Sequence, residues 1–117
     1  MALTEPYVGS FTASTVELSF VSGTSTLQSI TDDGVYQLFL ELDALLQGDI
    51  FEVRIKEKVR AASTQRTCQL FVLADAQGTD GANAVLPPLQ LMHGWDMTII
   101  RTAGVDRVIA YSIRKIV

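Results

Sequence analysis

The end of the chain carries the clearest alternation of apolar and polar residues, and it predicts a hairpin. Between Trp95 and Lys115, with a turn centred on Gly104, the large apolar residues meet on one face. The predicted pairs on that face are Trp95 with Ile113, Met97 with Tyr111 and Ile99 with Ile109, and on the other face Asp96 with Ser112, Thr98 with Ala110 and Ile100 with Val108. A shift of one residue would turn the apolar set toward solvent, so the pattern favours one register.

The same alternation predicts further strands upstream. The predicted strands and inward residues are 15–21 with Val16, Leu18 and Phe20, 35–42 with Tyr36, Leu38, Leu40 and Leu42, and 50–59 with Phe51, Val53 and Ile55, with a weaker strand at 26–30. The apolar run 68–74 predicts a central strand that is buried on both faces. Pro87 and Pro88 cannot donate ladder hydrogen bonds, so the segment 84–92 is expected at an edge or with a bulge.

About eight strands without alternating helices predict an all-β fold, a single-domain antiparallel β-sandwich of the jelly-roll type. One short helical turn is expected near 43–47, because Asp43 stands at an N-cap position and Gly48 follows the end. Residues 1–14 lack clean periodicity and are expected to form an N-terminal extended arm or an irregular first strand. The β-sandwich domain then spans 15–117.

Composition narrows the function classes. The 117 residues suit one domain, and 9 basic against 13 acidic residues give a net charge of −4. This balance disfavours a nucleic-acid partner, which would need clustered Lys and Arg to neutralise phosphates. The sequence also has neither the apolar run of a membrane-spanning helix nor the pattern of a secretion signal, so we expect no membrane partner and synthesis in a cytoplasm.

The sequence offers little catalytic chemistry. Cys68 and His93 are the only thiol and the only imidazole, and Cys68 lies in an apolar run where burial would make it inert. Asp75, Asp80 and Asn83 share one loop and offer oxygen atoms to a calcium ion, although Asp and Asn are also simply common in turns. We therefore expect no enzymatic activity, no catalytic residue, no cofactor and no metal site, while a cation at loop 75–83 stays open.

Two groups of basic residues allow a partner contact. The run from Arg54 to Arg60 is either a contact for a polyanion or, more simply, a solvated strand face. In the predicted hairpin, Arg101 and Arg107 lie opposite each other at the tip, which costs stability unless an acid from elsewhere or from a partner chain compensates them. Asp96 would lie diagonal to Arg114 and form an exposed ion pair with it.

The chain resembles a group of small virion proteins of tailed bacteriophages from about residue 33 to the C-terminus. The segments that carry this resemblance are Gly34-Val-Tyr-Gln-Leu, Gly48-Asp-Ile-Phe-Glu-Val-Arg-Ile-Lys-Glu-Lys-Val, His93-Gly-Trp-Asp-Met-Thr, Arg101-Thr-Ala-Gly-Val-Asp-Arg and Tyr111-Ser-Ile-Arg-Lys115. These phrases are structural and carry no catalytic site.

The resemblance implies a β-sandwich on the virion surface, a capsid decoration or cement protein that binds the major capsid protein and stabilises the head. A homo-oligomer, dimer or trimer, is expected. The candidate partner contacts are Tyr7, Phe11, Arg101 and Arg107, with the N-terminal arm as a tether. Two alternatives stay open: another virion component at the connector, tail or fibre, and a carbohydrate- or receptor-binding module, for which Tyr7, Tyr36 and Trp95 are the candidate aromatic residues.

Overall fold

A computed structural model describes residues 2–78 and 81–116 of the chain. These residues contain nine strands and no helix, and their bounds are β1 Leu3–Ala13, β2 Leu18–Ser19, β3 Gly34–Glu41, β4 Ile50–Glu57, β5 Arg66–Ala74, β6 Asn83–Val85, β7 Leu89–Leu91, β8 Asp96–Ala103 and β9 Arg107–Ile116. The strands form two antiparallel sheets. Sheet A has the order β1-β9-β3-β6, with β7 also paired to β3, and sheet B has the order β2-β8-β4-β5.

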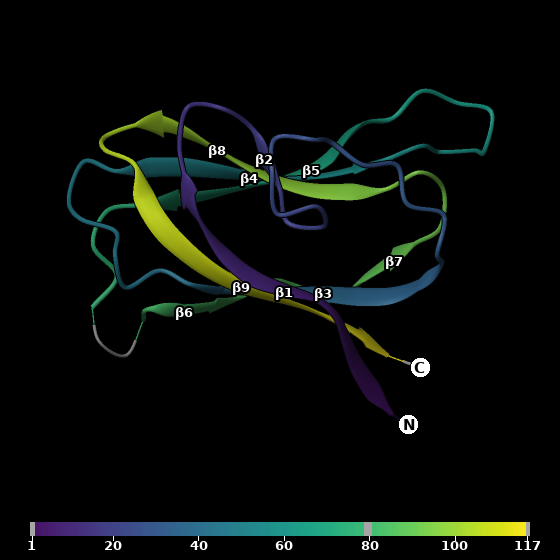
Figure 1. The fold of residues 1–117 in the computed structure, drawn as a ribbon, viewed down its shortest axis with the longest axis horizontal. Coiled ribbons are helices and arrows are strands. Elements are labelled where there is room, and N and C mark those ends of the chain that lie inside the picture. The colour runs from purple at the N-terminus through teal and green to yellow at the C-terminus, as the bar shows by residue number, and fades with distance from the viewer. Residues whose placement is uncertain (1, 79–80, 117) are drawn as a thin grey trace.

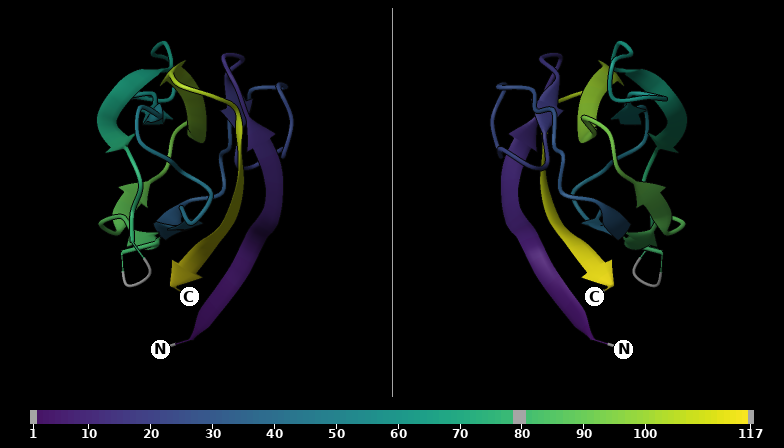
Figure 2. Two further views of the ribbon diagram at one scale, coloured as in Figure 1. Left: turned by 90° about the vertical axis from the view of Figure 1, so that its left-hand side faces the viewer. Right: turned by 90° about the vertical axis from the view of Figure 1, so that its right-hand side faces the viewer.

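The strand order is that of a jelly roll. The strands at the same position in the two sheet orders are β1 and β2, β9 and β8, β3 and β4, and β6 and β5. Each of these pairs is consecutive in the chain, and its two strands lie in opposite sheets. Figure 1 shows β2, β4, β5 and β8 of sheet B above β1, β3, β6 and β9 of sheet A. The side views show β1 along one flank of the sandwich and the teal and green strands, which include β5 of sheet B and β6 of sheet A, along the other (Figure 2). The predicted all-β, single-domain sandwich is therefore confirmed.

The core lies between the sheets and is built from the inward rows that the alternation predicts. Its largest fully buried side chains include Trp95, Tyr36, Phe20 and Phe51. The Trp95 ring packs against Tyr36 at 4.5 Å between centroids, and its indole nitrogen donates a hydrogen bond to the Asp32 carbonyl over 2.9 Å. Burying side chains of this kind contributes roughly 1.5–3 kcal/mol each, which makes these rows the main source of stability.

The predicted C-terminal hairpin is wrong, although its inward row is right. Strand β8 pairs with β4 and β2 in sheet B, whereas β9 pairs with β1 and β3 in sheet A. Residues 104–106 thus carry the chain across the sandwich from one sheet to the other. Both arrangements bury the same row, here Met97 and Ile99 from β8 and Ile109 and Ile113 from β9.

Asp49 fixes this crossing. The backbone N–H of Val105 donates to its Oδ1 over 3.0 Å, and Arg107 Nε donates to its Oδ2 over 2.6 Å. Gly104 has φ +86°, and a Cβ atom there would lie 2.2 Å from Asp49 Oδ1. Only glycine combines this left-handed conformation with so close an approach.

The segment after β3 forms two consecutive turns, so the predicted helical turn near 43–47 is wrong. Leu45 N–H donates to the Leu42 carbonyl and Asp49 N–H to the Leu46 carbonyl, each over 3.1 Å. The Asp49 carboxylate also accepts from Leu46 N–H over 2.8 Å. This side chain, rather than Asp43 as an N-cap, organises the connection between β3 and β4.

Strand β5 is an edge strand, which corrects the prediction of a central strand at 68–74. Its only partner among the described residues is β4, and its outward side chains, including Leu70 and Val72, are exposed. Phe71 and Leu73 pack against the core, but burial there does not explain the apolar side chains of Leu70 and Val72.

The predicted strand 15–21 shortens to β2, and Val16 is exposed rather than inward. The predicted strand 26–30 is reduced to a single bridge between Ile30 and Trp95. The loop after β2 packs on the outer side of sheet B. The buried Asp96 carboxylate holds it there by accepting hydrogen bonds from Ser19 Oγ over 2.7 Å and from Gln28 N–H over 2.9 Å, and it also accepts from Met97 N–H over 2.8 Å. Asp96 is thus a structural acceptor, and the predicted exposed pair with Arg114 is wrong.

Both ends of sheet A follow the sequence pattern more closely. Residues 3–13 form β1, so the N-terminal segment includes the irregular strand that we left as an option, with a register shift between Thr4 and Tyr7. Strands β6 and β7 both pair with β3 at the sheet edge and flank Pro87 and Pro88, as expected. Within the part of the chain that the structure describes, no helix is long and apolar enough to cross a membrane.

Candidate functional site

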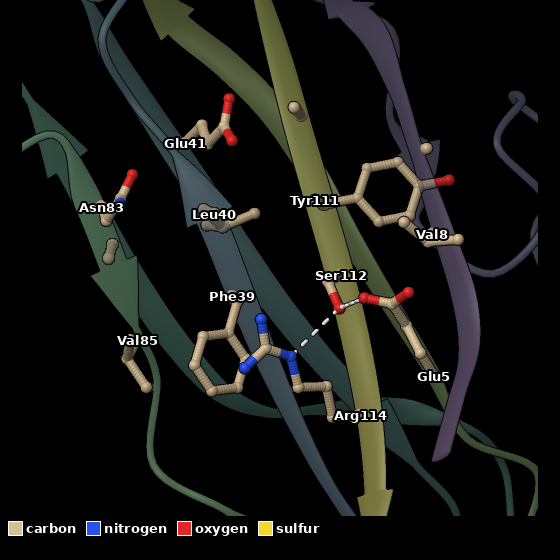
Figure 3. Close-up of a pocket in the computed structure, with 13 residues that line it drawn as sticks. Glu5, Val8, Phe39, Leu40, Glu41, Asn83, Val85, Tyr111, Ser112 and Arg114 are labelled. Atoms are coloured by element: carbon tan, nitrogen blue, oxygen red, sulfur yellow. Dashed lines mark hydrogen bonds between the residues drawn. The ribbon is translucent and has the colours of Figure 1, made fainter. Parts of the chain in front are cut away.

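An open groove of about 510 Å³ lies on the outer face of sheet A. Four strands supply its lining, with β9 and β3 in the middle and β1 and β6 at the sides (Figure 3). The lining residues are Glu5, Val8, Gly9, Phe39, Leu40, Glu41, Asn83, Ala84, Val85, Ala110, Tyr111, Ser112 and Arg114. Strand alternation places Val8, Phe39 and Ser112 on the face opposite the core-facing row, whereas Leu40 and Tyr111 belong to that row and are buried in the core.

The apolar part of the groove comes from Val8, Phe39 and Val85. Val8 and Val85 are exposed, and Phe39 is half-buried. Arg114 lies over the Phe39 ring, with its guanidinium carbon 3.7 Å from the ring centroid. This cation–π contact holds a charged group directly beside apolar surface.

Polar side chains border the apolar part. Ser112 donates a hydrogen bond to Glu5, and Arg114 Nε donates to Ser112 Oγ over 3.3 Å, as the dashed lines in Figure 3 show. Glu41 and Asn83 lie on the other side of Leu40 in the same view. The groove therefore offers apolar contact, carboxylates, an amide and one guanidinium, which suit the binding of a protein surface or another polar ligand.

The sequence prediction missed Phe39 as a candidate contact. Of the three predicted aromatic candidates, Tyr36 and Trp95 are fully buried and Tyr7 is half-buried. The signal was present, because Phe39 is a large apolar residue on the polar face of β3, between Gln37 and Glu41. An apolar residue out of phase with the core row is the pattern that marks such a surface.

Arg101 and Arg107 do not face each other across a ladder, since they belong to different sheets. Arg101 Nε pairs with Asp106 over 2.8 Å, and Arg107 pairs with Asp49. The predicted opposition of the two arginines is therefore wrong, and each has an acidic partner within the chain. The hydrogen bond from Arg107, together with those from Leu46 and Val105, lowers the pKa of Asp49 to about 2.

Tyr7 and Phe11 lie on β1 and turn toward the core. Tyr7 meets Trp95 edge-on at 6.1 Å between centroids, and Phe11 stacks on Phe20 at 5.3 Å. Both rings are half-buried, so each leaves part of its surface accessible. Their role as partner contacts stays a prediction.

Cys68 is exposed rather than buried, which corrects the expected setting of this thiol. Its Sγ donates to the Ile55 carbonyl over 3.2 Å. Partial burial and the charge of Glu57 raise the pKa of the thiol, so it holds its proton more firmly than a free cysteine. The Glu57 carboxylate itself accepts from the backbone N–H groups of Met92 and His93.

The loop proposed for a cation is described only in part. Asp80 lies outside the described residues, and Asn83 begins β6. Asp75 Oδ1 accepts from the Gly48 N–H over 2.8 Å, so this carboxylate ties the loop to the turn before β4. Among the described residues no group of three or more His, Cys, Asp or Glu side chains is arranged to hold a metal ion.

Two residues of the basic run, Arg54 and Lys56, lie on β4 and pair with neighbouring acids. Lys56 pairs with Glu17 over 2.8 Å, and Arg54 pairs with Glu52 over 2.9 Å. Burial alone would raise the pKa of Glu17, but hydrogen bonds from Lys56 and Thr98 outweigh it and lower the pKa. The Lys56 and Glu17 side chains are only 15% and 17% exposed, so the loop before β2 covers this part of the strand face and the predicted solvated face is wrong there.

Comparison with known proteins gives similarity in fold alone. No family model and no curated protein matches the sequence. The solved structure of Bacillus endospore appendages, a family of disulfide-linked pili, is similar with a TM-score of 0.53 and 16% identity, covering 97% of this chain and 86% of that one. Empty top-component particles of cowpea mosaic virus give a TM-score of 0.46 at 12% identity, covering 76% of this chain and 56% of the capsid chain. The pilus match supports the β-sandwich assignment.

Proposed function

We propose that this chain is a non-enzymatic structural protein of a tailed bacteriophage particle. It binds the outside of the major capsid shell as a decoration or cement protein and stabilises the head. The resemblance of residues 33–117 to small phage virion proteins supports the virion assignment, and the net charge of −4 suits a shell exterior better than contact with packed DNA.

The observation that carries the proposal is the groove on the outer face of sheet A. Its apolar part is formed by Val8, Phe39 and Val85, and its border by carboxylates and Arg114. An apolar centre with a polar border is the usual composition of a protein–protein contact, and exposed apolar patches on soluble proteins mark such contacts. The groove lies on paired strands, so the contact surface is preformed.

The titratable groups with shifted pKa values support a structural rather than a catalytic role. Burial raises the pKa of Asp96, Arg107 lowers that of Asp49, and Lys56 with Thr98 lowers that of Glu17. Each of these carboxylates holds a loop or a strand crossing in place, and none of them lines the groove. Burial accounts for the shift at Asp96, and hydrogen bonds with ion pairs account for the shifts at Asp49 and Glu17, without assigning a reaction.

Occupancy on purified phage particles tests the proposal. We expect Val8→Asp and Val85→Asp each to lower the number of copies per particle at least about tenfold, because a carboxylate would be buried against the shell without a partner. Val59→Asp makes the same change at an exposed position outside the groove and should leave occupancy unchanged. Unchanged Trp95 emission would verify that each variant is folded.

Normal occupancy of both groove variants would contradict the assignment of this surface to the capsid. Binding to purified heads that lack the protein separates shell contact from incorporation elsewhere. Saturable binding to such heads supports the proposal, and binding only to tails or connectors would overturn it in favour of another virion component.

A carbohydrate- or receptor-binding module is the second candidate, favoured by the aromatic ring of Phe39 beside carboxylate and amide groups in an open groove. A sugar stacking on the outer face of that ring would have to displace Arg114. Glycan binding by the wild type that is lost in Phe39→Ala would favour this second function, whereas glycan binding that Phe39→Ala leaves intact would count against the groove as its site.

A further inference from the structure

We infer that β5 pairs with β5 of a second copy of this chain, antiparallel and about a two-fold axis, so that two B sheets join into one. The inference concerns the free protein and does not depend on the capsid role. It selects the dimer from the two oligomeric states that the sequence left open.

The first observation is an unpaired backbone edge. Sheet B ends with β5, whose only strand partner within the described residues is β4. The N–H and C=O groups on its other side are free to bind a further strand. Strand β5 lies on the flank opposite β1, which is the long edge strand of sheet A (Figure 2).

The second observation is that, over residues 69–74, where pairing with β4 is regular, this edge lacks the features that normally prevent strand addition. Residues 67–74 contain no charged residue and no proline. Leu70 and Val72 point away from the core and are 51% and 59% exposed. A long, uncharged and apolar edge of this kind pairs with other strands unless charge, proline or a bulge blocks it.

Strand β1 provides the contrast within the same molecule. It carries Glu5 and Pro6, and its pairing with β9 shifts register between Thr4 and Tyr7. Charge, proline and irregular pairing are the features that protect edge strands. Strand β5 also has a register shift, near Cys68, but from Gln69 onward it is regular, uncharged and free of proline, which favours pairing between two β5 strands over pairing of β5 with β1.

The geometry of β5 restricts the register to two-fold axes centred on a residue. Ile55 pairs with Gln69 and Lys56 pairs with Thr67, so the register between β4 and β5 shifts at Cys68. From Gln69 onward the pairing is regular. A two-fold axis perpendicular to the sheet keeps side chains on their own face, so the two residues of each pair must both point outward or both inward. Centring the axis on Phe71 places Leu70 opposite Val72 of the second copy and Gln69 opposite Leu73.

The charges at the two ends of β5 also favour an antiparallel copy. Arg66 begins the strand and Asp75 follows its end. Antiparallel pairing brings Arg66 of one copy near Asp75 of the other, whereas parallel pairing would place like charges together. The β5 strands of two antiparallel copies are thus complementary in their terminal charges and in their apolar side chains.

Sedimentation velocity of the full chain over a concentration series tests the dimer. We expect a reversible dimer at about 100 µM, since a contact limited to one strand edge is small and weak. Val72→Lys should raise the dissociation constant at least about tenfold by placing a charge at the joined edge. Val108→Lys makes the same change at a residue that is 56% exposed on sheet A and should leave the dimer intact.

A wild-type protein that stays monomeric over this range would overturn the inference. Loss of the dimer in Val108→Lys with an intact dimer in Val72→Lys would also overturn it, since sheet A would then form the contact. Species that grow beyond the dimer with concentration would indicate head-to-tail pairing and contradict the two-fold arrangement.

Disulfide trapping tests the register with two single-cysteine proteins, Cys68→Ser with Leu70→Cys and Cys68→Ser with Val72→Cys. Mixed and mildly oxidised, they should form a disulfide-linked heterodimer in preference to either homodimer, because Leu70 lies opposite Val72. Dominant Leu70→Cys homodimers would contradict the register centred on Phe71. Because both experiments use the free protein, their failure leaves the particle-binding result unaffected.

Discussion

Arg107 donates from Nε to the buried carboxylate of Asp49 over 2.6 Å, and this contact joins two connections that cross the sandwich. Arg107 begins β9 just after the crossing from β8, while Asp49 ends the turn that leads into β4. The same carboxylate accepts from Leu46 and Val105. One acidic side chain thus holds the β3–β4 and β8–β9 connections together at one end of the jelly roll.

Acid should weaken this end of the molecule. The pKa of Asp49 falls from 3.8 to about 2 in the folded protein, so the folded state binds this proton less tightly than the unfolded state. The stabilisation is therefore complete above pH 4 and is lost as the pH falls from about 4 to 2. Denaturant unfolding over this range should show the loss, and Asp49→Asn should remove most of that pH dependence.

Asp106→Asn serves as the control for that profile. Asp106 pairs with Arg101 near the same crossing, but its carboxylate is largely exposed. Such a surface pair contributes under about 1 kcal/mol, so the variant should keep the wild-type slope. An Asp49→Asn protein with an unchanged slope would show that other carboxylates cause the acid sensitivity.

Gly104→Ala should destabilise the fold more than Gly48→Ala. Both glycines have positive φ angles, which cost a residue with a side chain about 1–3 kcal/mol. At Gly48 a Cβ atom meets nothing within 4 Å, whereas at Gly104 it would overlap the Asp49 carboxylate and backbone. Thermal unfolding measures the difference, and equal losses for the two variants would contradict the close packing at Gly104.

Asp96→Ala should loosen the loop that covers the outer side of sheet B. The substitution removes the acceptor of Ser19, Gln28 and Met97, and each buried donor left unpaired costs about 1–3 kcal/mol. Hydrogen exchange should accelerate at the Gln28 amide. Asp43→Ala, at an exposed carboxylate, should change the free energy of unfolding by no more than about 0.5 kcal/mol. Unchanged protection at Gln28 in Asp96→Ala would argue against this anchoring role.

Trp95 reports on the core directly. Its side chain is fully buried between Tyr36 and Tyr7, and its indole N–H is bonded to Asp32. The emission of the folded protein should be blue-shifted and should not respond to added glycans. A red-shifted emission, or a shift on adding a glycan that binds, would contradict this position of the ring.

The sequence pattern specifies which side chains face the core, but not which strands pair. Alternation around Gly104 is satisfied equally by a hairpin within one sheet and by a crossing between two sheets, since both bury the same row. The connection of residues 104–106 is short enough for a hairpin turn and long enough to reach the other sheet. The deciding contact comes from Asp49, which is distant in sequence and has no periodic signal.

The surface residues were predicted less well for a related reason. We interpreted the apolar run 68–74 as core, yet Leu70 and Val72 are exposed on an edge strand. Phe39 escaped notice because its neighbours on the same face, Gln37 and Glu41, are polar. Hydrophobicity alone does not distinguish a residue buried in its own fold from one exposed for a partner.

Electron microscopy of the phage particle that carries this protein tests the central proposal most directly. The account predicts density for the jelly roll on the outside of the head, with the groove of sheet A, formed by β1, β9, β3 and β6, turned toward the major capsid protein. Density for the protein in the tail, connector or fibres, or on the head with sheet A facing solvent, would contradict it.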